Sequence, residues 1–259
     1  MLQIEPIPAF DDNYIWMLSS EDSALVTLVD PGDETPVLER LQADGLQLGA
    51  ILLTHHHYDH IGGVPELLLA YPGIPVYGPA GASINALDHP LREADRLELP
   101  GLGVTLEVMD VPGHTATHIA YLGEGALFCG DTLFAAGCGR VFDGTHEQLA
   151  HSLLRIAALP AETRIYCAHE YTLANLGFAE WVEPQNEAIK QRISDEQARR
   201  ERGLPTLPST LQLEFATNPF LRGDQAQVRT AAGRYAGHAL TSQEAIFTAL
   251  RNWKDREYD

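Results

Sequence analysis

The segment LLTHHHYDHIGG, residues 52–63, constrains the fold more than any other part of the sequence. Four histidines and one aspartate fill five of six consecutive positions between an apolar run and two glycines. Buried without partners, such polar groups would each cost about 1–3 kcal/mol, and metal coordination removes that cost. If the apolar run is a strand, alternate side chains share a face, so His55 and His57 point toward one ion while Asp59 and His60 turn toward a second. HxHxDH after an apolar strand therefore predicts a metal site.

Three later segments each place one ligand-type residue directly after a predicted strand. They are His114 in MDVPGHTATH, Asp131 in ALFCGDT and His169 in RIYCAHEYT. In α/β proteins functional groups gather at the ends of strands, so these side chains belong with the first segment. Five histidines and two carboxylates fill two sites of nitrogen and oxygen ligands, and Asp131 is the natural bridge because a carboxylate has two oxygens. Ligands without sulfur suit zinc, iron or manganese.

The rest of the chain divides into a strand-rich part and a helical part. Up to residue 170, short runs rich in β-branched and aromatic residues predict strands, whereas helical periodicity dominates afterwards. Charge follows the same division, with a balance of −18 over residues 1–170 and −1 over residues 171–259. We therefore expect an α/β domain at 1–170 and a small helical domain at 171–259.

Local signals place several element ends. Thr35 as N-cap, the proline that follows it and Gly45 after the last turn predict a helix between them. Thr145 and Gln148 predict a capping box at the start of another helix. Glu124, between two glycines, predicts a hairpin turn.

Charge and composition exclude some classes of protein. A formal net charge of −19 argues against nucleic acid as a partner, because phosphate binding needs a basic surface. No run of about 18 apolar residues predicts a membrane span, and the N-terminus lacks the pattern of a secretory signal. Cys129, Cys138 and Cys167 show no CxxC spacing and are interpreted as buried apolar residues in a reducing compartment. We expect a soluble, cytoplasmic monomer with no membrane partner.

The motifs THHHYDH, PGHTATH, GDTLFAAGCGR and CAHEYT resemble those of the metallo-β-lactamase superfamily. AGCGR, AHEYT and the RNWKD tail narrow the resemblance to the glyoxalase II, or hydroxyacylglutathione hydrolase, family, from FDDNYIW at the front to RNWKD near the end. The resemblance implies an αββα sandwich with a helical C-terminal domain and two divalent metal ions, with zinc expected and iron or manganese as alternatives. It assigns one ion to His55, His57 and His114, and the other to Asp59, His60 and His169, with Asp131 between them.

The resemblance also implies a reaction and a substrate. The expected activity is hydrolysis of a glutathione thioester, S-D-lactoylglutathione or a close 2-hydroxyacyl analogue, in methylglyoxal degradation. Asp59 and Asp131 are the expected catalytic residues. As metal ligands they help to hold the two ions, and a hydroxide that bridges the ions attacks the acyl carbonyl. The residues implied in glutathione binding are Arg140, Tyr171, Arg251 and Lys254. Some family members have Lys and Tyr where this chain has Arg140 and Phe142, and Phe142 lacks the phenolic hydrogen-bond donor.

Other readings of the same residues remain open. A persulfide dioxygenase on this scaffold would use one iron, which the second set of ligands disfavours. A phosphodiesterase or nuclease is disfavoured by the acidity of residues 1–170. A structural or metal-storing module is disfavoured because structural zinc sites are closed, often cysteine-rich sets of four ligands.

Overall fold

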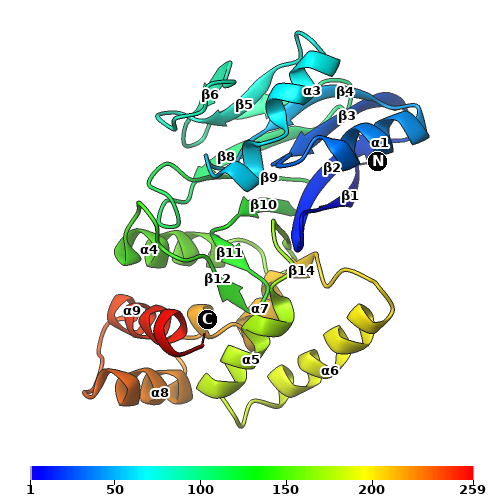
Figure 1. Cartoon of the computed structure of the whole chain (residues 1–259). Helices are drawn as coiled ribbons and strands as arrows, with labels where there is room; N and C mark the ends of the chain where they lie inside the picture. The colour runs from blue at the N-terminus through cyan, green and yellow to red at the C-terminus, as the bar shows by residue number, and fades with distance from the viewer. Residues whose placement is uncertain (1, 259) are drawn as a thin grey trace. The chain divides into compact units, whose positions relative to one another are not determined.

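A computed structural model describes residues 2–258 of the chain (Figure 1). Backbone contacts divide it into two compact units. Unit 1 contains the chain up to Asp110 together with Thr117–Gly130, and unit 2 contains Val111–Ala116 together with the chain from Asp131 onward. Within residues 2–258, no helix combines the length and apolar character needed to cross a membrane. The domain boundary near residue 170 stays a prediction.

Unit 1 contains a six-stranded mixed sheet in the order β1-β2-β3-β4-β5-β6. The first three strands are antiparallel neighbours, whereas β3 to β6 run parallel. Parallel neighbours need a crossover connection, and here α1 joins β3 to β4 while α2 and α3 join β4 to β5. The bounds are β1 Leu2–Ala9, β2 Asn13–Ser20, β3 Ser23–Val29, α1 Thr35–Asp44, β4 Gln47–Leu52, α2 Tyr58–Ile61, α3 Val64–Ala70, β5 Val76–Pro79 and β6 His89–Leu91.

Helices α1 and α3 cover one face of this sheet (Figure 1). Val37 and Leu41 of α1 and Leu67 of α3 are fully buried in one cluster with sheet residues such as Met17 and Ile51. Strand β4 is buried on both faces, which is why AILL is a continuous apolar run and not an alternating one. This burial fixes the position at which the histidine segment leaves the strand.

A second group of strands in unit 1 is antiparallel, in the order β7-β8-β9-β10. The bounds are β7 Arg96–Glu98, β8 Thr105–Asp110, β9 Ile119–Gly123 and β10 Ala126–Gly130. Glu124 has a left-handed φ of 50° and joins β9 to β10, so the predicted hairpin is confirmed.

Unit 2 is mainly helical. Its short strands form two pairs, β11 with β12 and β13 with β14. The strands and early helices are β11 Leu133–Phe134, β12 Gly137–Cys138, α4 His146–Ala157, β13 Arg164–Cys167, α5 Thr172–Val182, α6 Glu187–Glu201 and β14 Ser209–Thr210. The remaining elements are α7 Leu211–Thr217, the 3-10 helix η1 Pro219–Leu221, α8 Ala226–Ala236, α9 Gln243–Trp253 and the π-helical turn η2 Lys254–Tyr258.

Two of the three predicted helix ends are confirmed and one is wrong. Thr145 and Gln148 form the capping box of α4, and Gly45 ends α1 with a left-handed φ of 66°. The N-cap of α1 is Glu34 and not Thr35, which is already the first helical residue. The Thr35 N–H donates instead to Asp33 Oδ1 at 2.9 Å, so a side chain two residues earlier than expected satisfies the helix start.

Candidate metal centre

The histidine segment changes from extended to helical backbone at His57, and this change aims its side chains. Strand β4 ends at Leu52, and His57 is the extended N-cap of α2, with φ −66° and ψ 146°. Asp59 and His60 therefore lie in a helical turn, whereas His55 precedes it. The ring centroid of His55 lies 4.7 Å from that of His57 and 4.1 Å from that of His60. The His55 imidazole thus lies next to the imidazoles of both His57 and His60.

Asp30 holds this loop in place, and the sequence interpretation missed it. It follows β3, is buried, and has a left-handed φ of 54°. Its Oδ1 accepts the Thr54 N–H at 2.7 Å, and its Oδ2 accepts the Thr54 hydroxyl at 2.7 Å. The same Oδ2 lies 3.1 Å from His60 Nδ1. A carboxylate beside Nδ1 holds the proton there and leaves the lone pair of His60 on Nε2, as carboxylates commonly do for metal-binding histidines. The available signal was an aspartate directly after a predicted strand.

Asn13 supports the carboxylate of Asp59. Its Nδ2 donates to Asp59 Oδ2 at 3.1 Å and to the Asp59 carbonyl oxygen at 3.3 Å. Nε2 of His60 lies 3.4 Å from the same Oδ2. Asn13, the first residue of β2, therefore supports the loop that contains Asp59.

The glycines around the loop permit a close backbone approach. A Cβ built on Gly32 would lie 1.9 Å from the carbonyl oxygen of Asp59, and one built on Gly62 would lie 2.7 Å from the Gly32 carbonyl oxygen. Contacts below 3.0 Å are not tolerated by real Cβ atoms. The glycine after the histidine motif is therefore needed because α2 packs directly on the backbone of the loop that follows β3.

In unit 2, one carboxylate faces two imidazoles. Asp131 Oδ2 lies 3.5 Å from His114 Nε2, and Asp131 Oδ1 lies 3.4 Å from His169 Nε2. All three residues are buried or nearly so, with 4–7% of their surface exposed. Each oxygen of Asp131 thus has a different histidine beside it, an arrangement compatible with a carboxylate shared by two ions.

Hydrogen bonding also orients the rings in unit 2. His114 Nδ1 lies 2.8 Å from the Arg140 carbonyl oxygen, which can only accept, so Nδ1 carries the proton and Nε2 has the lone pair. His169 stacks on Tyr171 with ring centroids 4.7 Å apart and planes 6° apart. Phe142, 64% exposed, has its ring 5.2 Å from that of His114.

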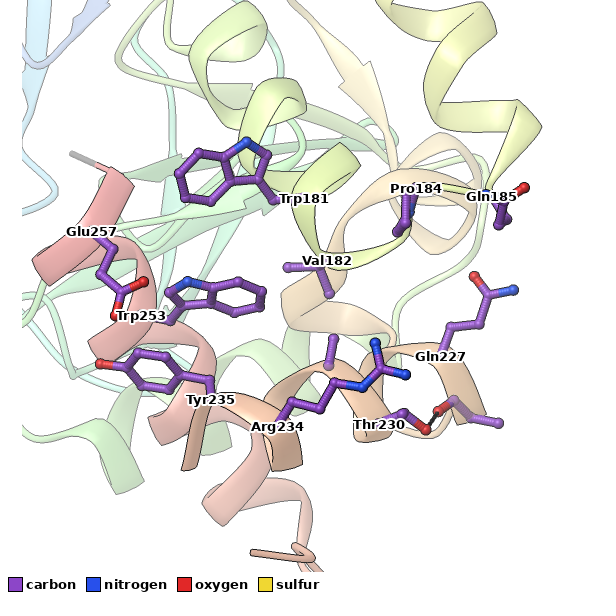
Figure 2. Close-up of a pocket in the computed structure, with 12 residues that line it drawn as sticks. Trp181, Val182, Pro184, Gln185, Gln227, Thr230, Arg234, Tyr235, Trp253 and Glu257 are labelled. Carbon is purple, nitrogen blue, oxygen red and sulfur yellow. Dashed lines mark hydrogen bonds between the residues drawn. The ribbon is translucent and has the colours of Figure 1, made fainter. Parts of the chain in front are cut away.

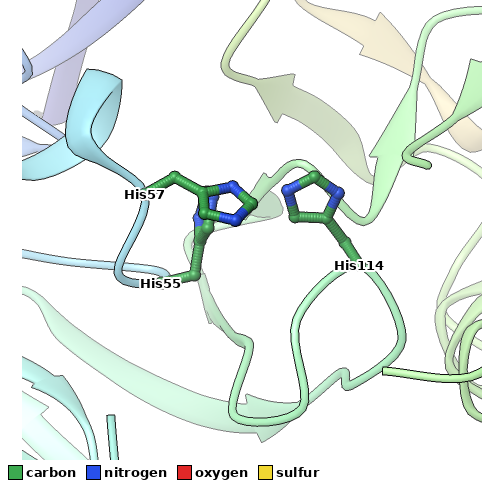
Figure 3. A group of neighbouring side chains, drawn as sticks. All are labelled: His55, His57 and His114. Carbon is green, nitrogen blue, oxygen red and sulfur yellow. The ribbon is translucent and has the colours of Figure 1, made fainter. Parts of the chain in front are cut away.

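The described residues include three groups of ligand-type side chains that could hold a metal ion: His55, His57 and His114; Asp59, His60 and His169; and Asp30, His55 and His60. Figure 3 shows the rings of the first set. In the third set Asp30 is already engaged by Thr54, so it acts as a support for His60. The histidine and aspartate clusters fit a dinuclear metal site, since they combine buried imidazoles with fixed tautomers and carboxylates, without sulfur.

His118 lies in unit 1 and packs against His55. Its ring stacks on that of His55, with centroids 4.6 Å apart and planes 17° apart, and its Nδ1 lies 3.0 Å from the Ile119 carbonyl oxygen. It is 1% exposed and packs as a structural histidine behind the first ligand.

The predicted glutathione-binding cations gather around Asp255. Arg251 is 1% exposed, its Nη2 lies 2.8 Å from Asp255 Oδ1, and its Nη1 donates to the Cys138 carbonyl oxygen at 3.0 Å. Arg140 Nε lies 3.7 Å from the same Asp255 oxygen, and its side chain is 53% exposed. Lys254 is 6% exposed, with Nζ 5.8 Å from the centre of the Tyr258 ring. Arg140 and Arg251 thus approach the same carboxylate oxygen of Asp255.

The three cysteines are buried and form no disulfide within residues 2–258. Burial raises the pKa of the Cys138 thiol to about 11, against the opposing effect of the nearby Arg251. Burial likewise raises the pKa of the Cys167 thiol to about 12. Both are therefore neutral and unreactive near pH 7, as expected for small apolar residues.

An open groove of about 790 Å³ lies elsewhere in unit 2 and contains none of the predicted site residues. It is bordered by the end of α5, one face of α8, and the region of Trp253 and Glu257 (Figure 2). Tyr235 and Trp253 stack there with ring centroids 5.6 Å apart. Its size does not make it the reaction site, because it offers no cluster of metal ligands.

Comparison with known proteins agrees with this geometry. Residues 10–169 match the metallo-beta-lactamase superfamily, and residues 170–257 match the hydroxyacylglutathione hydrolase C-terminus. The hydroxyacylglutathione hydrolase of Alkalilimnicola ehrlichii is 57% identical over 256 residues, covering 99% of this chain and 100% of the relative. That of Aeromonas hydrophila is 54% identical, covering 98% and 99%.

Solved structures show the same fold. ETHE1 from Myxococcus xanthus has a TM-score of 0.68 at 21% identity, covering 100% of this chain and 93% of that one. TTHA1623, in a di-iron-bound form, has a TM-score of 0.60 at 27% identity, covering 84% and 100%. The predicted fold class is confirmed as a metallo-β-lactamase-like α/β sandwich with two mixed sheets and a helical C-terminal region. The chain thus belongs to the hydroxyacylglutathione hydrolase, or glyoxalase II, family of the metallo-β-lactamase superfamily.

Proposed function

We propose that the chain hydrolyses S-(2-hydroxyacyl)glutathione thioesters, S-D-lactoylglutathione first among them, to a 2-hydroxy acid and glutathione. This would place it in the degradation of methylglyoxal, with D-lactate as the acid product. The single observation that carries the proposal is the position of Asp131, whose two oxygens face the Nε2 atoms of His114 and His169. Membership of the family, at 57% identity over nearly the whole chain, supports the reaction.

We propose seven residues as the ligands of two divalent ions, with zinc expected and iron or manganese also suited to these donors. One ion would be held by His55, His57 and His114, the other by Asp59, His60 and His169, with Asp131 shared. When bound, the two ions would act as Lewis acids and lower the pKa of a water molecule toward neutrality. The chain itself supplies fixed imidazole tautomers through Asp30 and the Arg140 carbonyl, so little reorganisation accompanies binding.

Substrate recognition needs a local positive field in an acidic protein, because glutathione carries carboxylates. We propose Arg140, Tyr171, Arg251 and Lys254 as the glutathione-binding residues. Arg140 and Tyr171 are the accessible members, at 53% for the arginine side chain and 37% for the tyrosine residue. The buried Arg251 and Lys254 would act mainly through their charge and by ordering the Cys138 carbonyl and Asp255.

The wider assignments follow from the same proposal. Residues 1–170 would be the catalytic domain and residues 171–259 the glutathione-binding domain, which agrees with the ranges of the two family matches. The partner would be the small-molecule thioester alone, with no nucleic acid or membrane, and the chain would act as a monomer. Three buried thiols outside any disulfide support a reducing, cytoplasmic compartment.

The test measures hydrolysis of S-D-lactoylglutathione beside a lactoyl thioester of a small thiol lacking the glutathione carboxylates. The metal content is measured on the same sample. We expect strong preference for the glutathione thioester, and a Michaelis constant that rises with added salt because exposed charges are screened. Equal rates on both thioesters would remove the proposed role of the cations. An oxygen-consuming activity on glutathione persulfide with one iron per chain would instead favour the dioxygenase alternative.

A further inference from the structure

Two aromatic side chains in unit 1 are exposed on segments that meet at Asp59. Phe10 is 53% exposed and Tyr58 is 75% exposed, although large apolar side chains are stabilising only when they are buried. Tyr58 directly precedes Asp59 in α2. Phe10 is the first residue of the turn between β1 and Asn13. Asn13 donates two hydrogen bonds to Asp59, so the turn that contains Phe10 and the helix that contains Tyr58 are joined at that residue.

The backbone of Phe10 is strained as well. Its φ of 50° lies in the left-handed region, which suits glycine or asparagine and disfavours a bulky side chain. A strained non-glycine residue beside a ligand-binding site is an indication of function, because neither turn geometry nor burial calls for phenylalanine there.

Both rings border the same backbone contact. A Cβ built on Gly32 would lie 3.0 Å from Cε2 of Phe10, and a Cβ built on Gly62 would lie 2.9 Å from Cζ of Tyr58. Gly32 and Gly62 approach each other there, since the Gly62 Cβ would lie 2.7 Å from the Gly32 carbonyl oxygen. Phe10 and Tyr58 thus present two apolar surfaces to solvent around one short stretch of chain that supports Asp59.

We propose that Phe10 and Tyr58 form an aromatic rim that contacts the acyl group of the thioester and sets preference among 2-hydroxyacyl substituents. The proposal rests on the proposed function and deepens it. The rim is apolar, so it binds the substituent on the hydroxyacyl carbon and not the charged glutathione. A methyl group covers little of two exposed rings, whereas a phenyl group covers much more. The rim therefore favours large apolar acyl groups over lactoyl.

The test compares kcat/KM for S-D-lactoylglutathione and S-D-mandeloylglutathione, in which a phenyl ring replaces the lactoyl methyl group. The ratio is measured in the wild type and in Phe10→Ala, Phe10→Leu, Tyr58→Ala and Tyr58→Phe. A ratio taken within one variant cancels any effect on Asp59 that acts equally on both substrates. Leu69→Ala is the matched control, because Leu69 is 75% exposed on α3 and belongs to no part of the site. Metal content is measured for every variant.

We expect Phe10→Ala and Tyr58→Ala each to lower the mandeloyl-to-lactoyl ratio by about fivefold or more, the scale expected for loss of one apolar contact. Phe10→Leu and Tyr58→Phe retain apolar surface and keep most of the ratio, and Leu69→Ala leaves it unchanged. An unchanged ratio in both alanine variants, with an active wild type, overturns the rim and leaves the proposed function intact. A metal-loaded wild type that hydrolyses neither thioester overturns the proposed function, and the rim falls with it.

Discussion

Replacing Gly32 with alanine should damage the metal centre far more than it damages the fold. The added Cβ would lie 1.9 Å from the carbonyl oxygen of Asp59 and 2.5 Å from its carbonyl carbon, and both are backbone atoms that cannot rotate away. Ordinary van der Waals contact begins near 3.4 Å, so Asp59 or Gly32 has to move by about 1.5 Å. Because a misplacement of about 1 Å at a reacting group costs on the order of 100-fold, we expect kcat/KM to fall by about that factor or more.

The assay measures thioester hydrolysis, metal content and thermal unfolding of Gly32→Ala beside Gly73→Ala. Gly73 has a left-handed φ of 85° with no atom within 4 Å of its built Cβ, so alanine there adds backbone strain of about 1–2 kcal/mol and no collision. Gly73→Ala should lower the melting temperature while keeping both metals and its activity. Gly32→Ala should lose metal and activity together. A Gly32→Ala protein with full metal content and near-wild-type turnover would refute the packing argument.

Three further predictions concern side chains. Asp30→Asn should weaken metal binding or activity by about 10- to 100-fold because it disturbs His60, whereas Asp33→Asn in the same loop should not. Metal titration of both variants tests this prediction, and equal affinities would count against the role of Asp30. Arg251→Ala should destabilise the fold by about 1–3 kcal/mol, because it leaves the buried Cys138 carbonyl oxygen without its charged donor, and denaturant unfolding that shows no loss would contradict its structural role. Burial raises the pKa of the Cys138 thiol to about 11 and that of the Cys167 thiol to about 12. Both thiols should therefore resist a thiol reagent at pH 8 in the native protein and react after unfolding. Rapid labelling of either thiol in the native protein would contradict its burial.

The sequence predicts where ligand-type side chains gather because these residues follow strands. Strand ends are readable from local apolar runs, and the structure brings His114, Asp131 and His169 together in unit 2 as expected from that pattern. The helical character of the region after residue 170 and the capping box of α4 are equally local signals, and both are confirmed.

The features that sequence reasoning missed depend on contacts between distant residues. Asp30 stands at the end of a predicted strand, and its role exists only because Thr54 and His60 fold onto it from 24 and 30 positions away. Likewise, the spacing of Arg251 and Lys254 predicts a shared helix face but not its burial. The misplaced N-cap of α1 has a local cause, since Asp33 reaches over Glu34 to the Thr35 N–H.

The most direct test of the central claim is stoichiometric reconstitution of metal-free protein with zinc, followed by thioester hydrolysis at each metal ratio. Two clusters of ligands that share Asp131 predict that activity reaches its maximum only at about two ions per chain. Full activity at one ion per chain, with no gain from a second, would contradict the dinuclear centre.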